Sequence, residues 1–130
     1  MIKICLLVLL ITTTAAFADD MTFFNAKTLA DRDEGSLSDA QKQALVQAQA
    51  PLVQAALSSC LTVNGTKPFS FVVVVALDSA GTVRKTWRSD ETKLAGCFHS
   101  VVAKATLNSP PRSPFYSSFE KGVSVDGVSQ

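Results

Sequence analysis

A run of nine nearly all apolar residues, Phe69–Leu77, constrains the fold of this 130-residue chain more than any other feature. Side chains alternate between the two faces of a strand, and here both faces are apolar. Phe71 and Val73 fall on one face, and Val72 and Val74 fall on the other. We therefore expect this strand to be central in a sheet, or to be covered on both sides for part of its length.

The strand is expected to begin after a turn at Asn64-Gly65 and to lead into a second turn at Asp78–Gly81, which predicts a hairpin. In the return strand, Thr82–Arg88, Val83 and Trp87 are predicted to share one face. The other face is predicted to be solvated and basic, and its cations are Arg84, Arg88 and, out of step, Lys85.

A helix that ends near Cys60 is predicted before the hairpin. Ser38 and Gln41 match a capping box at its start. Its apolar residues recur at three- and four-residue spacing, and they are Leu45, Ala48, Leu52, Val53, Ala56, Leu57 and Cys60. Pro51 lies inside this pattern, which favours a kink or two short helices over one straight helix.

A second helix is predicted after the hairpin, with Ser89 or Asp90 as its cap and Glu91 in its first turn. Its apolar stripe consists of Leu94, Cys97, Phe98, Val101, Val102 and Ala105. The proline-containing segment 108–114 ends this helix. A third strand follows over Phe115–Glu120 or slightly further, and a short extension that frays is expected after it.

The expected fold class is therefore α+β: a small antiparallel sheet, made of the hairpin and a third strand, packed against two helices. The segment 19–35 has no sustained hydrophobic period. We expect it to be an N-terminal extension that wraps the domain or stays partly mobile, with a single folded domain over residues 36–130.

The first eighteen residues have the pattern of a signal peptide. Lys3 precedes the apolar run Ile4–Ile11, which is too short to span a bilayer, and Ala16-Phe17-Ala18 resembles a cleavage site. We expect export to the periplasm, or secretion, with cleavage near Ala18. No later stretch is apolar for long enough to predict a membrane span.

The exported chain is expected to be nearly neutral. The whole sequence has 12 basic and 11 acidic side chains, and cleavage removes Lys3. This balance argues against binding to nucleic acid or to an anionic membrane surface, both of which favour a basic excess.

Two cysteines, Cys60 and Cys97, remain after cleavage. An even number in an exported chain predicts a disulfide, which would pin the two helices together. A bridge that closes a loop of this length contributes about 4 kcal/mol in the chain-entropy model. The alternative is two free, buried thiols.

The segment from the apolar strand to Cys97 resembles the TonB C-terminal domain, in particular its cysteine-bearing relatives in gliding-motility-type proteins. The residues that carry the resemblance are the Asp78-x-x-Gly81 turn, the following Thr82-Val83, and Leu94-Ala95-Gly96-Cys97, with the upstream Cys60 at the matching place. The resemblance covers about residues 50–125. It implies a small α+β domain whose edge strand accepts an extended segment of a partner by strand addition.

This chain departs from the family in two respects. The family has an aromatic-rich segment at the end of its second helix, whereas Thr106–Pro110 contains no aromatic residue. The inner-membrane anchor and proline-rich spacer of TonB are not found either, so we do not expect energy transduction by this chain alone.

His99 is the only histidine. Zinc requires three or four ligands, so with both cysteines in a bridge no metal site or other cofactor is predicted. A serine hydrolase would need His99 as a base together with one of Ser58, Ser59 or Ser100, but no nucleophile-elbow motif surrounds these serines. We expect His99 to lie on the flank of the helix beside Phe98, and no catalytic residue is predicted.

Two strands offer candidate partner-binding residues. Arg84, Trp87 and Arg88 form a tryptophan among cations, which is typical of a binding hot spot, although the alternative is that Trp87 packs in the core. On the last strand, Ser117, Ser118 and Glu120 predict either a polar, pairable edge or an ordinary edge blunted by charge, and Ser117 and Phe119 are the candidate partner-binding residues there.

The sequence therefore predicts a non-enzymatic domain of the cell envelope that binds a protein or peptide, in an accessory or an inhibitory, immunity-type role. Two alternatives stay open. One is a small hydrolase that uses His99, and the other is a structural homodimer formed by edge-strand pairing.

Overall fold

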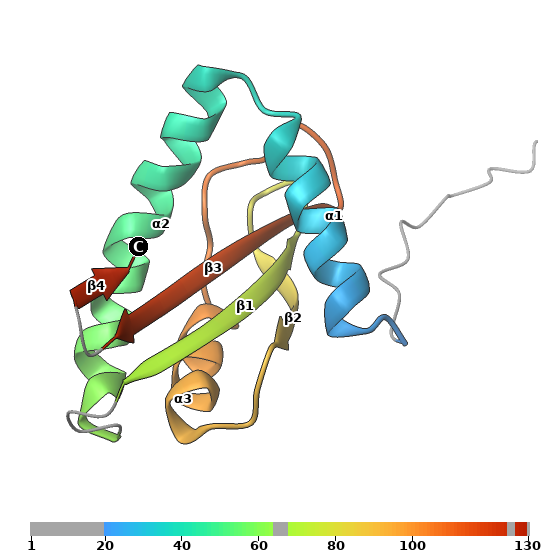
Figure 1. Ribbon diagram of the computed structural model, residues 1–130. Helices are drawn as coiled ribbons and strands as arrows, with labels where there is room; N and C mark the ends of the chain where they lie inside the picture. Colours follow the sequence, from blue (N-terminus) through green and yellow to red (C-terminus); the bar gives the residue numbers. More distant parts are fainter. Residues whose placement is uncertain (1–19, 64–67, 125–126, 130) are drawn as a thin grey trace, which may run out of the picture.

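The computed structural model describes residues 20–63, 68–124 and 127–129 (Figure 1). The predicted signal peptide, its cleavage site and the Asn64-Gly65 turn lie outside these ranges.

The described residues form helices, strands and one short 3-10 helix, η1, in an α+β arrangement, as predicted. In chain order they are α1 Phe23–Gly35, α2 Asp39–Cys60, η1 Leu61–Val63, β1 Phe69–Leu77, β2 Val83–Arg88, α3 Lys93–Val102, β3 Phe115–Ser124 and β4 Gly127–Ser129. The sheet is antiparallel with the order β2-β1-β3-β4, so β1 is central, as its sequence predicted. The short β4 forms where the sequence indicated only a fraying extension.

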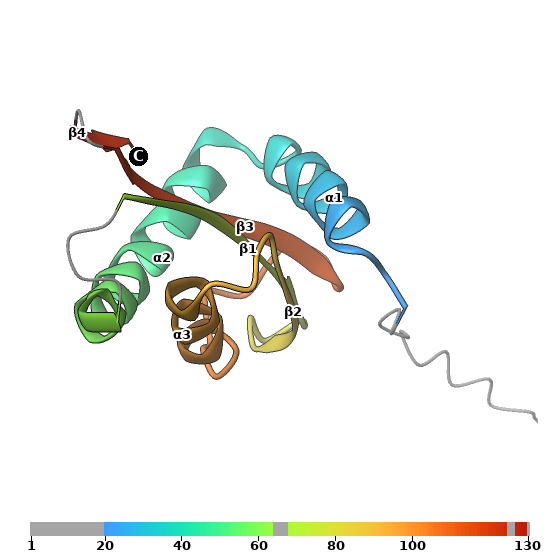
Figure 2. The same ribbon diagram turned by 60° about the horizontal axis from the view of Figure 1, so that its bottom comes forward.

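The sheet lies between two helical layers, with α1 on one face and α2 and α3 on the other (Figure 2). Val73 and Val75 of β1 belong to the larger core cluster, beneath α2 and α3. Val74 and Ala76 belong to a smaller cluster beneath α1. The prediction that β1 is covered on both sides is thus confirmed, but three helices cover the sheet rather than two.

Helix α1 provides the second cover, and it forms where the sequence showed no sustained period. Thr22 caps its start by accepting a hydrogen bond from the Asn25 N–H at 3.2 Å. Its fully buried apolar residues are small, Ala26 and Ala30, and the half-buried Phe23 and Leu29 pack beside them. The helix can therefore lie close to β1 and β3 without presenting a strong apolar stripe.

Helices α2 and α3 are joined by the predicted Cys60–Cys97 disulfide. The predicted capping box at Ser38 is also present. Helix α2 continues through Pro51 as one helix, so the expectation of two short helices is wrong. The cap of α3 is Thr92 rather than Ser89 or Asp90, and Glu91 precedes the helix instead of lying in its first turn.

The hairpin turn is held by Asp78, whose Oδ1 accepts hydrogen bonds from the backbone N–H groups of Ala80 and Thr82 at 2.9 and 3.0 Å. Gly81 has a positive φ of 82°, and a Cβ at this position would lie 2.5 Å from the Leu107 carbonyl oxygen. A glycine is therefore required by both backbone conformation and space.

A register shift at the start of β2 corrects one prediction. Ala76 pairs with Lys85 and Leu77 pairs with Val83, so Arg84 is the extra residue of a bulge. Val83 consequently packs in the larger cluster beneath α2 and α3, while Trp87 packs against the smaller one beneath α1. The predicted common face for Val83 and Trp87 is wrong, and Lys85 is in step with Trp87.

Candidate functional site

Strand β3 pairs with β1 on one side, and on the other side it pairs with β4 only at Gly122–Ser124. Over the rest of this outer edge, two carboxylates of α1 take hydrogen bonds from the strand. The Tyr116 N–H donates to Asp33 Oδ2 at 2.9 Å, and the Ser118 N–H donates to Glu34 Oε1 at 2.6 Å. These oxygens stand where the carbonyl groups of a neighbouring strand would be, so this edge is partly closed.

Asp33 is the more deeply placed of the two acids, with no exposed surface. Its Oδ1 accepts hydrogen bonds from Arg112 Nη2 and Arg32 Nε, both at 2.9 Å. Burial by itself raises the pKa of Asp33, but the hydrogen bonds from Arg112, the Tyr116 N–H and Arg32 outweigh it, and the pKa lies below its ordinary value. The carboxylate is therefore ionised and joins α1, the 108–114 segment and β3.

Glu34 also holds a side chain of β3. The Ser117 hydroxyl donates to Glu34 Oε1 at 2.7 Å and accepts from Gln49 Nε2 of α2 at 2.8 Å. Ser117 has no exposed surface, and Phe119 is only 2% exposed. These two residues were predicted to line a pairable edge, but the structure places them in the core, beneath α2 and α3.

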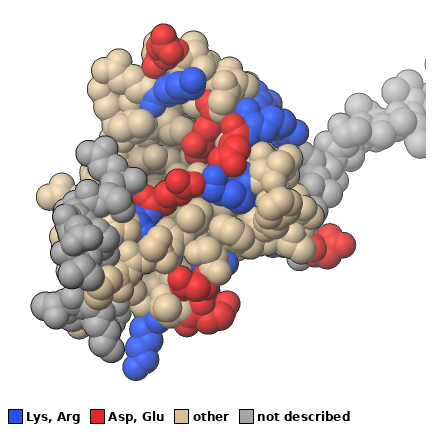
Figure 3. Space-filling model, in the orientation of Figure 1, with Lys and Arg blue, Asp and Glu red and all other residues tan. Residues whose placement is uncertain are grey.

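A third contact at this edge is an ion pair between Lys27 of α1 and Glu120, with 2.9 Å between Nζ and Oε1. Lys27 also pairs with Asp31 on its own helix. Figure 3 shows positive and negative side chains interspersed on the face that carries α1 and β3, with no large patch of one sign. The edge is thus covered by paired charges rather than by a field that attracts a charged ligand.

Strand β2 is the opposite edge of the sheet. The segment after α3 lies beside its start, where the Val83 N–H donates to the Ala105 carbonyl oxygen at 3.1 Å and Thr82 and Thr106 form an isolated bridge. Beside the rest of β2, the described residues include no strand on the outer side. The Ser89 N–H donates to the Val72 carbonyl oxygen at 2.9 Å. Backbone groups alternate in direction along an antiparallel strand, so those of Lys85 and Trp87 point to β1. Those of Thr86 and Arg88 point outward, where an added strand can reach them.

The cations of this strand are paired within the molecule. Arg84 Nε lies 2.7 Å from Asp78 Oδ2, and Arg88 Nη2 lies 2.5 Å from Glu91 Oε2. The hydrogen bond from Arg84 lowers the pKa of Asp78, which keeps this acid ionised. The three cations therefore do not form the predicted basic face, since Lys85 lies on the face of Trp87 and both arginines are in ion pairs. The outward main-chain groups of this edge are more available for binding than its charges.

Trp87 anchors the residues that precede α1. Its Nε1–H donates to the Met21 carbonyl oxygen at 2.8 Å, and its ring centroid lies 5.9 Å from that of Tyr116. The Lys85 ammonium lies over the Trp87 ring, 5.6 Å from its centroid. Trp87 is half-buried and packs against the smaller core cluster, so the packing interpretation accounts for its position.

His99 lies on α3, where its Nε2 contacts the Thr86 hydroxyl of β2. Burial and the nearby Arg88 charge lower the pKa of His99, and Glu91 opposes them, so the ring is neutral at pH 7. The Ser100 hydroxyl donates instead to the Gly96 carbonyl oxygen at 2.9 Å. His99 thus contacts a threonine at the β2 edge, and the structure assigns it no serine partner.

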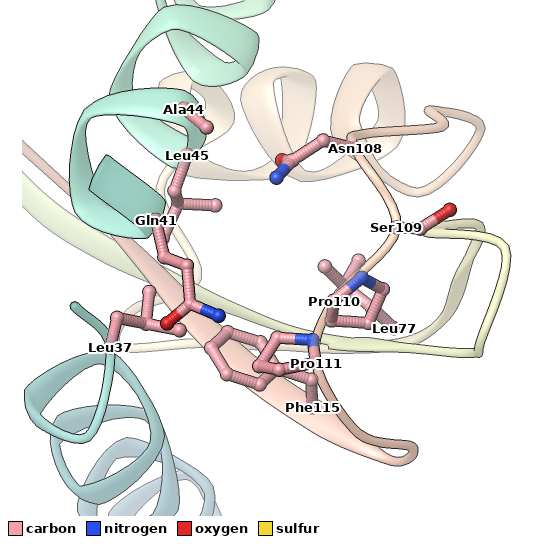
Figure 4. A pocket seen from close by; sticks show the side chains of 10 residues that line it. All are labelled: Leu37, Gln41, Ala44, Leu45, Leu77, Asn108, Ser109, Pro110, Pro111 and Phe115. Atoms are coloured by element: carbon pink, nitrogen blue, oxygen red, sulfur yellow. The ribbon is translucent and has the colours of Figure 1, made fainter.

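An apolar pocket of about 260 Å³ opens between the first turns of α2 and the segment after α3 (Figure 4). Leu77 and Phe115, both core residues, form part of its wall, while Gln41 and Asn108 supply polar groups at its rim. None of the ten side chains that line it is ionisable. The pocket thus offers neither an acid, a base nor a strong metal ligand.

Within residues 20–63, 68–124 and 127–129, no group of three His, Cys, Asp or Glu side chains is placed to hold a metal ion. In the same part of the chain, no helix has the length and apolar character needed to cross a membrane. No family model, curated protein or solved structure matches this chain.

The sequence analysis did not identify Asp33 and Glu34 as important residues. Neither belongs to a known motif, and both lie in a polar stretch that is typical of a solvated segment. The available signal was the apolar second face of β1, which required a cover that no predicted helix supplied.

Proposed function

We propose that this protein is an exported, periplasmic interaction domain without enzymatic activity, which binds an extended segment of a partner protein by adding it as a strand beside β2. The observation that carries this proposal is the difference between the two edges of the sheet. The β3 edge is taken by Asp33, Glu34 and β4, whereas on β2 only the start, at Thr82 and Val83, is bridged by the segment after α3, and no described strand lies beside Thr86 and Arg88. An open edge provides main-chain donors and acceptors in a fixed register.

The expected export rests on the signal-peptide pattern of residues 1–18. The Cys60–Cys97 disulfide is compatible with it, because disulfides persist in oxidising compartments. The resemblance to the TonB C-terminal domain also supports the proposal, since it implies strand addition at a sheet edge. A TonB-C-terminal-like fold and a role in the cell envelope, either accessory or inhibitory, are parts of the same proposal.

Because the arginines at the β2 edge are already in ion pairs, a partner is expected to bind mainly through main-chain hydrogen bonds. Arg84 and Arg88 already have acidic partners within the chain. Exposed ion pairs contribute little to affinity, so main-chain hydrogen bonds at Thr86 and Arg88 supply most of it. We expect binding to be only moderately sensitive to salt.

The test is a pull-down from periplasmic extract with three oxidised baits: the wild type, Thr86→Pro and Thr86→Val. Both variants lose the hydroxyl that contacts His99. Only the proline variant also loses the backbone N–H at this position, which points away from β1, so its loss breaks no β1–β2 hydrogen bond. We expect Thr86→Val to retain the partner and Thr86→Pro to lose it, with both folds verified by circular dichroism.

Retention of the same partner by Thr86→Pro would refute binding at this edge. The wild-type bait could instead capture no partner and sediment as a concentration-dependent dimer. If the Thr86→Pro protein were then monomeric, the results would favour the homodimer formed by edge-strand pairing.

A further inference from the structure

Two side chains of the β2 edge lie on the face of the sheet that α2 and α3 cover. Thr86 pairs with Val75, which belongs to the larger core cluster beneath these helices. Arg88 pairs with Val73 of the same cluster. Because paired residues of neighbouring strands point to the same face, the residue of an added strand that stands beside Arg88 also faces α3.

The Arg88 guanidinium is held against α3. A Cβ at Gly96 would lie 2.6 Å from Arg88 Nη1, so the glycine leaves room for this group. The Arg88 side chain is 29% exposed, whereas that of its ion-pair partner Glu91 is 83% exposed. The pair therefore joins a partly enclosed cation to a carboxylate that can rotate into water, and exposed pairs of this kind are weak.

The guanidinium also has donors to spare. It carries five N–H groups, and its bond to Glu91 is made by Nη2. A second carboxylate can therefore bind beside Glu91 or take its place. A carboxylate fixed on an added strand has an advantage over Glu91, because the main-chain hydrogen bonds of that strand already hold it in position.

The charges of the strand favour an acid at this position. The six residues of β2 include Arg84, Lys85 and Arg88 and no acid. Burial and the Arg88 charge lower the pKa of the nearby His99, so its ring is neutral at pH 7 and does not compete for a carboxylate. A cation beside Arg88 would meet a like charge, which is unfavourable between neighbouring strands, whereas an acid would meet an opposite one.

We propose that the partner segment carries an aspartate or glutamate beside Arg88, and that the Arg88 guanidinium binds this carboxylate in competition with Glu91. This inference rests on the proposed function, because it requires a strand added at β2. Main-chain hydrogen bonds supply most of the affinity, and the carboxylate selects among extended segments. The residues before and after it face α1, on the side of the half-buried Trp87, so apolar side chains suit these two positions.

The test is an NMR titration of the isotope-labelled, oxidised chain Asp19–Gln130 with the capped peptide Thr-Val-Glu-Val-Thr. Two further peptides have Gln or Lys in place of the central Glu. We expect the Glu peptide to bind about threefold to fivefold more tightly than the Gln peptide, and the Lys peptide to bind most weakly. The amide signals of Thr86 and Arg88 should shift in each titration.

Three variants locate the source of this preference. Arg88→Gln should abolish it without weakening the Gln peptide, while the matched control Arg84→Gln, which removes the same charge from the bulge of the same strand, should retain it. Gly96→Ala keeps every charge but displaces the guanidinium, so it should reduce the preference. Glu91→Gln removes the competing carboxylate and should increase it.

Equal binding of the Glu and Gln peptides, with shifts at Thr86 and Arg88, would overturn the selected carboxylate and leave strand addition in place. A preference that Arg88→Gln retains would also overturn it. If none of the three peptides shifts these amides, the inference is wrong, and the pull-down with Thr86→Pro decides the proposed function separately. Circular dichroism verifies each fold, and Glu91→Gln, which changes an exposed side chain, decides the outcome if Arg88→Gln fails to fold.

Discussion

Strand β2 and the part of β3 before Gly122 each have one side without a neighbouring strand over most of their length, and the two edges differ in how their backbone groups are satisfied. On β3 the outward N–H groups of Tyr116 and Ser118 are hydrogen-bonded to buried or half-buried carboxylates of α1. On β2 the two arginines pair with acids that flank the strand, Asp78 and Glu91, and the backbone of Thr86 and Arg88 is left uncovered. Proteins usually protect edge strands against unwanted pairing, so an unprotected one is a candidate binding site.

The difference is one of energy as well as geometry. Asp33 is fully buried between two arginines and a backbone N–H, so its removal leaves several groups without partners. Glu91 is 83% exposed, so if its carboxylate is removed by mutation, water can take its place as the hydrogen-bond partner of Arg88. The buried charge of Asp33 at the β3 edge is therefore structural, whereas the exposed Arg88–Glu91 pair at the β2 edge contributes little to stability.

Asp33→Ala should have the largest effect, because it leaves Arg112 and the Tyr116 N–H without their acceptor. We expect a loss of about 3–5 kcal/mol in the free energy of unfolding, measured by urea denaturation. Asp31→Ala removes an exposed acid from the same helix and serves as the control, with a change of less than about 1 kcal/mol. Equal effects of the two variants would remove the distinction between buried and exposed acids.

Glu34→Ala should cost about 1–3 kcal/mol, because Ser117 and the Ser118 N–H lose their common acceptor while water can partly replace it. The variant also uncovers part of the β3 edge. We expect it to bind an amyloid-type dye or to aggregate at concentrations at which the wild type does not. If its aggregation is unchanged, Glu34 does not protect the edge.

The dependence of stability on pH should separate the two edges. The pKa of His99, at β2, and that of Asp33, at β3, are both lowered in the folded state. The unfolded chain therefore takes up these protons more readily, and stability falls as the pH falls through each range. The loss from His99 begins near its ordinary value of 6.5, and that from Asp33 begins near 3.8. Asp78, whose pKa is lowered by the hydrogen bond from Arg84, adds to the loss in the lower range, so only the upper range belongs to one edge alone.

Urea denaturation at a series of pH values measures both losses. His99→Gln should abolish the loss between about pH 6.5 and 5 and retain the one below about pH 4, because the chain has a single histidine. A wild type whose stability does not change between pH 7 and 5 would contradict the environment that the structure gives His99.

Glu91→Ala should have the smallest effect, within about 0.5 kcal/mol in urea denaturation, because it breaks only an exposed pair with Arg88. In the proposed binding mode it should also leave partner capture intact. A stability loss similar to that of Glu34→Ala would show that the charges of β2 are as structural as those of β3.

The features that follow from local rules could be predicted from the sequence. The Ser38 capping box, the Asp78–Gly81 turn, the central place of β1 and the Cys60–Cys97 bridge depend on residues close in sequence or on simple counting. Each is confirmed. The fold class followed from these elements.

The features that depend on contacts between distant segments could not be predicted. Helix α1 buries alanines and holds β3 through carboxylates, so it lacks the apolar period by which helices are recognised. The bulge at Arg84 depends on pairing with β1 and reverses the face of every residue after it. On α2, the predicted apolar face does pack against the main core, but only Leu45, Ala56 and Cys60 of it are buried, while Val53 also lines a groove beside β3.

Amide hydrogen exchange, followed residue by residue by NMR, tests the contrast between the two edges most directly. In the free protein, the amides of Tyr116 and Ser118 should be protected like those inside the sheet, and those of Thr86 and Arg88 should exchange rapidly. Addition of the captured partner should then protect Thr86 and Arg88. Fast exchange at Tyr116 and Ser118, or protection of Thr86 and Arg88 in the free monomer, would contradict an open β2 edge opposite a closed β3 edge.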